Sequence, residues 1–345
     1  MKWLFGGVLA IVGLVALIAV GGYFVLKRDD VPYETLAARY ENAASRYVDL
    51  PSGVRMHYRD EGQANGPPLL LIHGFSASVH TWEPWVARLA DEYRVISVDL
   101  PGHGLTRAPA GYQASIEAFR DALREFATTQ NLTHFAIAGS SMGGNVAWEY
   151  ALAFPDQVDA LILVGASGWQ EDRAGLEEDP PIFKLLRNPV LGPLLRDLDN
   201  TQLARGGLEA SFYDPALVDD AMVQRYVQMA RAPGHRDILL QMTLGFRERQ
   251  YATPERLAAL QMPVLILHGD TDRLVPPAHG QQFHDAIAGS QLIVFENTGH
   301  IPQEERADES ATAVREFLYP VIDGAALTAL PDLTAPTRCL DRAPC

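Results

Sequence analysis

Short apolar runs alternate with helical patterns along most of this 345-residue chain, and this alternation limits the fold more than any other feature. The strand-like runs lie at residues 54–60, 69–72, 94–100, 134–139, 160–165, 263–269 and 291–297. The helical patterns lie at 82–90, 114–129, 145–154, 278–288 and 307–318. Strands that alternate with helices pair in parallel through right-handed crossovers. The sequence therefore predicts an α/β protein with a mostly parallel sheet flanked by helices.

The alternation stops between residues 167 and 251. This segment has few strand-like runs and several amphipathic helical stretches, interrupted by prolines at 180, 181, 189, 193, 215 and 233. A helical block inserted into an α/β alternation predicts a lid over the carboxyl edge of the sheet. We therefore assign residues 51–166 and 252–322 to the core and 167–251 to the lid. The composition of 323–345 predicts a weakly ordered tail.

The chain begins with an uncharged apolar run at residues 3–26. A helix of this length spans about 36 Å, enough to cross the hydrocarbon core of a bilayer. A cleaved signal peptide has a shorter apolar core. We expect residues 1–30 to form a membrane anchor, the alternative being a buried core helix. Residues 31–50 continue with a helical spacing that reaches Tyr47, so we expect a juxtamembrane helix that docks on the domain or lies on the membrane, docking being favoured.

Charges near the apolar run do not orient it, because Lys2 flanks one side and Lys27 and Arg28 the other. Cys339 and Cys345 are the only cysteines. A disulfide between them would place the domain in an oxidising compartment, whereas two unpaired tail thiols would carry no such meaning. We expect a single-pass anchor in a bacterial inner membrane, with the periplasmic side favoured for the domain.

The net charge of −15 argues against a nucleic-acid partner, because phosphate contacts need clustered Lys and Arg. No set of Cys and His has the spacing of a metal site, and we expect neither a metal nor an organic cofactor.

The stretch IAGSSMGGN holds two serines, of which only Ser141 is framed as Gly-x-Ser-x-Gly, by Gly139 and Gly143. Ser140 has Ala138 and Met142 at the corresponding positions. The stretch joins a predicted strand to a predicted helix, which is where a nucleophile turn forms. A phosphate-binding turn would need Gly-x-Gly-x-x-Gly, which this stretch lacks. The pattern favours Ser141 as a nucleophile.

A serine nucleophile needs a base and a carboxylate that orients the base. Two histidines follow late strands, and His300, in the loop NTGH, is better placed as the base than His268, which directly ends a strand. Asp270 and Asp272 both lie in the loop HGDTDRLVPP, and the residues alone do not separate them.

The oxyanion of an acyl-transfer intermediate needs backbone donors. The amide of Met142, at the start of the helix after Ser141, is one candidate, and the amide of Phe75 in HGFSAS is the other. We expect His73 to be a buried hydrogen-bonding residue. We also expect Asp99 and His103, in DLPGHGLT, to have structural roles.

Together, HGFSAS, DLPGHG, GSSMGG and HGDTDRLVPP with NTGH resemble the α/β-hydrolase superfamily over about residues 50–320. The resemblance implies Ser141 as nucleophile, His300 as base and Asp272 as the acid, with Phe75 as an oxyanion donor. The apolar N-terminus, HGFSAS and the helical lid are most similar to membrane-anchored monoacylglycerol lipases of the α/β-hydrolase-domain 6 type and to related bacterial lipases and esterases.

The expected function is that of a membrane-anchored serine ester hydrolase with a small-molecule substrate, a monoacylglycerol or a short-to-medium acyl lipid ester. A carbon–carbon hydrolase of ring-cleavage products or a lactonase would use the same triad. The polar substrate of a carbon–carbon hydrolase would call for basic lid residues near the site, and the lid offers Arg231, Arg236, Arg247 and Arg249 for this role. A non-catalytic membrane-tethered binding protein is a further alternative, which the intact serine, histidine and aspartate disfavour.

Overall fold

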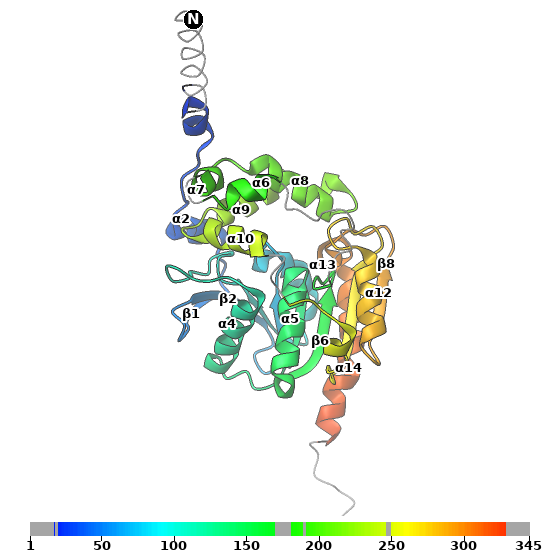
Figure 1. Cartoon of the computed structure of the whole chain (residues 1–345). Coiled ribbons are helices and arrows are strands. Elements are labelled where there is room, and N and C mark those ends of the chain that lie inside the picture. The colour runs from blue at the N-terminus through cyan, green and yellow to red at the C-terminus, as the bar shows by residue number, and fades with distance from the viewer. Residues whose placement is uncertain (1–16, 18–19, 170–180, 189–190, 246–249, 329–345) are drawn as a thin grey trace, which may run out of the picture.

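The computed structural model describes residues 17, 20–169, 181–188, 191–245 and 250–328, which are coloured in Figure 1. Within these residues the chain forms one eight-stranded sheet in the order β1-β2-β4-β3-β5-β6-β7-β8. The strands are β1 (Ser45–Asp49), β2 (Arg55–Gly62), β3 (Pro68–Ile72), β4 (Arg94–Val98), β5 (Phe135–Ser140), β6 (Val158–Val164), β7 (Val264–Gly269) and β8 (Gln291–Phe295). Strand β2 is antiparallel to β1 and β4, and the other neighbours pair in parallel. The predicted α/β sheet is confirmed.

Helices cover both faces of the sheet, which explains why its central strands are continuous apolar runs. In β3, Leu69 and Leu71 belong to one buried cluster, and Leu70 and Ile72 belong to the other. The first cluster is completed by α3 (Glu83–Leu89) and α14 (Ala307–Thr328). The second is completed by α4 (Ile116–Thr129), α5 (Met142–Ala153) and α12 (Pro277–Ala286). The sheet is thus the middle of three layers.

The segment between β6 and β7 contributes helices and no strand among its described residues, and it lies over one end of the sheet (Figure 1). Its elements are α6 (Pro181–Leu186), α7 (Leu191–Arg196), α8 (Thr201–Ser211), η3 (Pro215–Leu217), α9 (Asp220–Ala230) and α10 (His235–Leu244). The remaining short elements are η1 (Val79–Trp82), η2 (Pro155–Gln157), α11 (Pro254–Leu257) and α13 (Pro302–Glu305). Leu208, Phe212 and Val223 of the lid pack together with Ile301 of the core.

The predicted juxtamembrane helix is shorter than its spacing indicated. Helix α2 (Tyr33–Tyr40) ends early, and residues 45–49 instead form β1 at the edge of the sheet. The side chain of Asn42 accepts a hydrogen bond from the amide of Ala44, which turns the chain away from the helix. Beyond that turn, Tyr47 and Val48 pair with β2, an environment that suits aromatic and β-branched residues. The helical interpretation of residues 43–47 was therefore wrong.

Helix α2 docks on the domain, as expected. Leu36 is fully buried and packs with Leu105 of the core and Ala232 of the lid. The hydroxyl of Tyr33 lies 2.9 Å from Nε2 of His235, which adds a polar contact to the lid. The helix thus contacts both the core and the lid.

Most of the predicted membrane anchor lies outside the described residues. Of its apolar run, only Leu17 and residues 20–26 are described, and these are helical. Among the residues that are described, no helix combines the length and the apolar composition that crossing a membrane requires.

At the C-terminal end, α14 continues beyond residue 318, where the pattern predicted its end, and into the predicted tail as far as Thr328. Alanine and leucine in residues 325–328 are strong helix formers, which accounts for the extension. Cys339 and Cys345 lie outside the described residues.

Candidate active site

Ser141 occupies a tight turn between β5 and α5, with φ of 55° and ψ of −119°. This conformation is rare for a residue with a side chain and persists only where the surrounding structure imposes it. The amide of Ser141 donates to the carbonyl of Val164 at 2.9 Å, which ties the turn to the end of β6. Ser140 is buried and its Oγ accepts a hydrogen bond from Gln303 at 3.2 Å, whereas Ser141 is partly exposed. Of the two serines, Ser141 is therefore the one accessible to a substrate.

The glycines on either side of Ser141 are required by close backbone contacts. A Cβ atom on Gly139 would lie 2.2 Å from the carbonyl oxygen of Gly143. A Cβ on Gly143 would lie 2.2 Å from the carbonyl oxygen of Ile72 and 2.4 Å from that of His73. A side chain at Gly139 would push the first turn of α5 away from β5, and one at Gly143 would push it away from β3.

His300 and Asp272 form a buried pair, with Nδ1 of the histidine 2.7 Å from Oδ2 of the carboxylate. The other carboxylate oxygen accepts the amides of Leu274 and Val275 at 2.8 and 2.9 Å. Burial alone would raise the pKa of Asp272, but the imidazoles of His300 and His268 and the amide donors hold this pKa well below its usual range. An ionised carboxylate only accepts, so the proton of His300 sits on Nδ1 and Nε2 is left able to act as a base.

The two other candidates from this region have different surroundings. Asp270 is exposed, and its carboxylate accepts the amide of Thr298 at 3.2 Å, which supports the loop that leads to His300. His268 is buried, with Nε2 3.0 Å from the carbonyl of Val275 and 3.2 Å from the carboxylate of Asp272. The structure therefore pairs His300 with Asp272, and His268 packs behind that carboxylate.

Gly165 brings the histidine–aspartate pair to the strand end that also holds the serine turn. It follows β6 with φ of 51°, and a Cβ there would lie 2.7 Å from the carbonyl of His300 and 3.5 Å from Oδ2 of Asp272. The preceding residue, Val164, accepts the amide of Ser141. Sequence reasoning missed Gly165, although a glycine that ends a buried strand is a signal of close backbone approach.

The loop after β3 lies beside Ser141. A Cβ on Gly74 would lie 3.1 Å from Cβ and 3.7 Å from Oγ of the serine. Met142 is the first residue of α5, where helical amides have no partner within the helix. Within the described part of the chain, the amides of Phe75 and Met142 donate to no protein acceptor. Both candidate oxyanion donors are thus free to bind a ligand oxygen.

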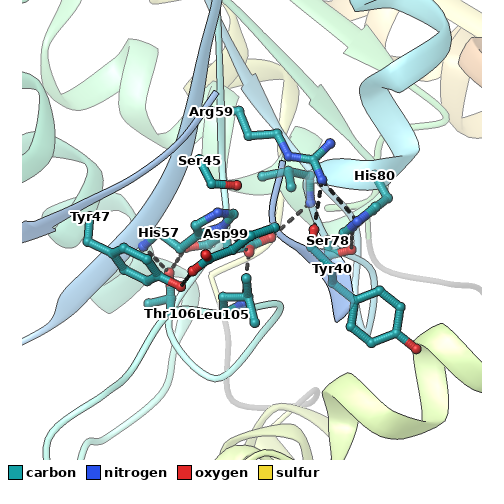
Figure 2. A network of polar contacts seen from close by, with 12 residues as sticks. Tyr40, Ser45, Tyr47, His57, Arg59, Ser78, His80, Asp99, Leu105 and Thr106 are labelled. Atoms are coloured by element: carbon teal, nitrogen blue, oxygen red, sulfur yellow. Dashed lines mark hydrogen bonds and ion pairs between the residues drawn. The ribbon is translucent and has the colours of Figure 1, made fainter. Parts of the chain in front are cut away.

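Asp99 is the centre of a network of polar contacts between loops that follow β3 and β4 (Figure 2). Its carboxylate accepts the amides of Val79 and Leu105, both at 2.8 Å, and lies 2.7 Å from Nδ1 of His57. Burial opposes ionisation, but His57, the neighbouring His73 and the amide of Leu105 hold the pKa of Asp99 well below its usual range. Asp99 therefore fastens the segment after β3 to the segment after β4, in agreement with the structural role predicted for it.

His73 and His103 are buried and packed together, with ring centroids 5.1 Å apart. The amide of Leu100 donates to Nε2 of His73 at 3.0 Å, so Nδ1 carries the proton and donates to the carbonyl of Gly74 at 2.7 Å. Burial lowers the pKa of both histidines. His73 holds the Gly74 loop in place and is not a base.

Among the described residues, no group of His, Cys, Asp or Glu is arranged to hold a metal.

Residues 303–305, just after His300, make contacts that sequence reasoning did not predict. The amide of Gln303, which is fully buried, donates to Thr81 at 3.0 Å as well as to Ser140. Thr81 donates in turn to the carboxylate of Glu304 at 2.5 Å, and burial raises the pKa of Glu304 to about 7. In the sequence, QEE reads only as the polar first turn of a helix.

The model of the family described as "alpha/beta hydrolase fold" matches residues 67–307. This match covers the serine turn, the aspartate and histidine loops and the whole lid. The chain belongs to the α/β-hydrolase family. The predicted membership is confirmed, and the α/β hydrolase is an enzyme of the hydrolase class.

Three relatives illustrate the range of this family. Lipase 1 of Psychrobacter immobilis is 29% identical to this α/β hydrolase over 78% of this chain and 82% of its own length. The 2-hydroxymuconate semialdehyde hydrolase of Pseudomonas sp. strain CF600 is 28% identical over 78% of this chain and 92% of its own length. The crystal structure of a bacterial membrane phospholipase A, described as a virulence factor, is 25% identical and superposes with a TM-score of 0.68 over 94% of this chain and 100% of its own.

We expect Gly143→Ala to destabilise this α/β hydrolase by about 1–3 kcal/mol, because the added methyl group overlaps two carbonyl oxygens of β3 and its following loop. Its hydrolytic activity should fall as the Ser141 turn shifts. The matched control is Gly206→Ala in α8, where a Cβ meets nothing within 4 Å and a helix former should stabilise by up to about 1 kcal/mol. Urea unfolding of both variants measures the two changes. Wild-type stability of Gly143→Ala would contradict the close contact.

Proposed function

We propose that this protein is a serine carboxylic-ester hydrolase with Ser141, His300 and Asp272 as its catalytic triad. The observation that carries the proposal is the meeting of two features at the end of β6. One is the forced turn that exposes Ser141, and the other is the buried pair in which Nδ1 of His300 faces the carboxylate of Asp272. The chain order of serine, acid and histidine is the order that this fold requires.

The proposed reaction uses these groups in sequence. Nε2 of His300 takes the proton of the Ser141 hydroxyl as Oγ attacks the ester carbonyl, and Asp272 stabilises the imidazolium. The amides of Phe75 and Met142 donate to the oxyanion of the tetrahedral intermediate. His300 then gives its proton to the departing alkoxide, which leaves as the alcohol. Water attacks the acyl-enzyme by the same route, releases the carboxylic acid and restores Ser141.

The proposed substrates are monoacylglycerols or short-to-medium acyl lipid esters. Two relatives carry names that refer to lipid ester hydrolysis, the lipase and the membrane phospholipase A. The likeness to the membrane phospholipase A also spans 94% of this chain, so it reaches beyond the segment that the family model matches. The side chain of Phe75, beside the proposed oxyanion site, is 44% exposed and adds apolar surface at the serine turn.

We propose in addition that the apolar run within residues 1–30 anchors the enzyme in a membrane, and that residues 27–30, the linker that follows this run, are fixed to the lid. The amide of Arg28 donates to the carbonyl of Asp197 at 2.8 Å, and the amide of Asp199 donates to the carbonyl of Leu26 at 2.8 Å. Figure 1 shows the described residues 20–26 on the side of the domain that carries the lid. An anchor at this position would hold the lid close to the lipid surface that supplies the substrate.

A carbon–carbon hydrolase of ring-cleavage products is the second candidate, and the similarity to the 2-hydroxymuconate semialdehyde hydrolase favours it. Its polar substrate would call for basic lid residues at the site. Arg231 and Arg236 are instead bound to the linker, through the carbonyl of Asp29 at 2.6 Å and the carboxylate of Asp30 at 2.6 Å. The other two basic residues considered for this role, 247 and 249, lie outside the described residues. These contacts support the ester hydrolase.

The nucleophile is tested by substitution and labelling. Ser141→Ala should lower hydrolysis of p-nitrophenyl butyrate by at least about 10³-fold, because it removes the proposed nucleophile, and should abolish fluorophosphonate labelling. Ser140→Ala should keep its labelling, since that side chain is buried. Labelled Ser141→Ala protein would contradict the proposal. Turnover on monoacylglycerols compared with ring-cleavage dienoates separates the two candidate functions.

The acid is tested by comparing two aspartates of one loop. Asp272→Asn should cost about 10³–10⁴-fold in kcat, because the amide presents the wrong partner to Nδ1 of His300. Asp270→Asn should cost less than about tenfold, since it weakens only a supporting hydrogen bond to Thr298. Steady-state kinetics on a soluble ester measures both variants, and equal losses would refute the assignment.

The anchor is tested by a truncation that spares the linker. Protein that begins at residue 27 should move from the membrane fraction to the soluble fraction after cell lysis. It should keep the full-length turnover on a short soluble ester, because the bond from the amide of Arg28 to the carbonyl of Asp197 in the lid remains. Retention of the shortened protein in the membrane fraction would contradict the anchor.

A further inference from the structure

The lid is bonded directly to the loop that carries His300. The amide of His300 donates to the carbonyl of Ser211, the last residue of α8, at 2.7 Å. The two segments approach so closely that a Cβ on Gly299 would lie 2.4 Å from the same carbonyl and 2.8 Å from the amide of Tyr213. The backbone position of the histidine is therefore tied to residues 211–213 of the lid.

One carboxylate spans this contact. Oε1 of Glu305 accepts the amide of Gly299 and Oε2 accepts the amide of Tyr213, both at 2.7 Å. The first amide precedes the histidine, and the second belongs to the lid. Glu305 is half-buried, and burial raises its pKa, opposed by the two amide donors. Hydrogen bonds from amides to an ionised carboxylate are stronger than those to a neutral acceptor.

We propose that Glu305 is a positioning residue that clamps the lid segment 211–213 to the His300 loop and so sets the place of the catalytic base. The inference rests on the proposed function, because it assigns the base to His300. The loop has separate support on the strand side, where Arg306 donates to Thr298 at 3.1 Å. Glu305 supplies the support on the lid side, which no other described side chain provides for both segments.

This role follows from what a carboxylate can do and an amide cannot. A carboxylate offers two equivalent acceptors, one for each backbone amide. Glutamine at the same place offers one acceptor and one donor, so one of the two amides would face an NH₂ group and lose its bond. The lid segment and the histidine loop would then be held by the bond between His300 and Ser211 without the second, carboxylate contact, so the loop could shift. Small displacements of a catalytic group lower the rate of the chemical step far more than they lower substrate binding.

The test is Glu305→Gln in the full-length enzyme, with Glu309→Gln as the matched control. Glu309 is an exposed glutamate at the start of α14, outside the site. Active sites are counted by fluorophosphonate titration, so kcat refers to folded, competent enzyme. We expect kcat for p-nitrophenyl butyrate to fall by about ten- to a hundredfold in Glu305→Gln with KM within about twofold of the wild-type value. Glu309→Gln should match the wild type.

Glu305→Asp is the second variant, used in case the glutamine variant does not fold. Its shorter side chain cannot reach both amides, so kcat should fall again without a matching change in KM. Wild-type kcat in either folded variant, or a loss of activity explained by fewer titrated sites alone, would overturn the clamp. Ser141→Ala tests the proposed function separately: a defect in Glu305→Gln has meaning only if the serine variant is inactive.

Discussion

The close backbone contact between the turn at Ser141 and the carboxyl end of β3 is the constraint on which the rest of the site depends. Gly143 lies against the carbonyls of Ile72 and His73, so the nucleophile turn and the loop with Phe75 share one edge of the sheet. The amide of Ser141 binds Val164, and the glycine after Val164 admits the His300 loop. Three loops that are distant in the chain therefore converge because glycine allows their backbones to touch.

Two buried carboxylates, Asp272 and Asp99, each pair with a histidine but have different roles. Asp272 and Asp99 are both kept ionised by histidine and by backbone amides, which compensates the cost of burying a charge. Asp272 meets His300, the proposed base, whereas Asp99 meets His57 inside the sheet layer and fastens two loops. The same chemical pair thus serves as candidate catalytic machinery in one place and as scaffold in the other. What differs is that the His300 loop lies against Gly165, the residue after Val164, which accepts the amide of Ser141.

Local patterns predicted much of this arrangement because they report burial and turn geometry. The apolar runs located seven of the eight strands, and Gly-x-Ser-x-Gly located the exposed serine. Strand β1 was missed because Tyr47 fits a helical spacing as well as a strand, and only pairing with β2 decides between them. The contacts of Glu305 were missed because Tyr213 is far away in the sequence, and nothing in the local pattern indicates the bond to the amide of Gly299.

By itself, the sequence determined the α/β class, the inserted helical lid, the serine turn and the set of acids and bases that could serve it. These depend on periodicity and on glycine at fixed offsets, which are properties of neighbouring residues. The family resemblance already implied Asp272 rather than Asp270, and the pairing of Asp272 with His300 agrees with it. Tertiary structure alone decided how residues 27–30 bind the lid and that the lid touches the histidine loop through Glu305. Those contacts join segments far apart in the chain, and their geometry exists only once the sheet brings the segments together.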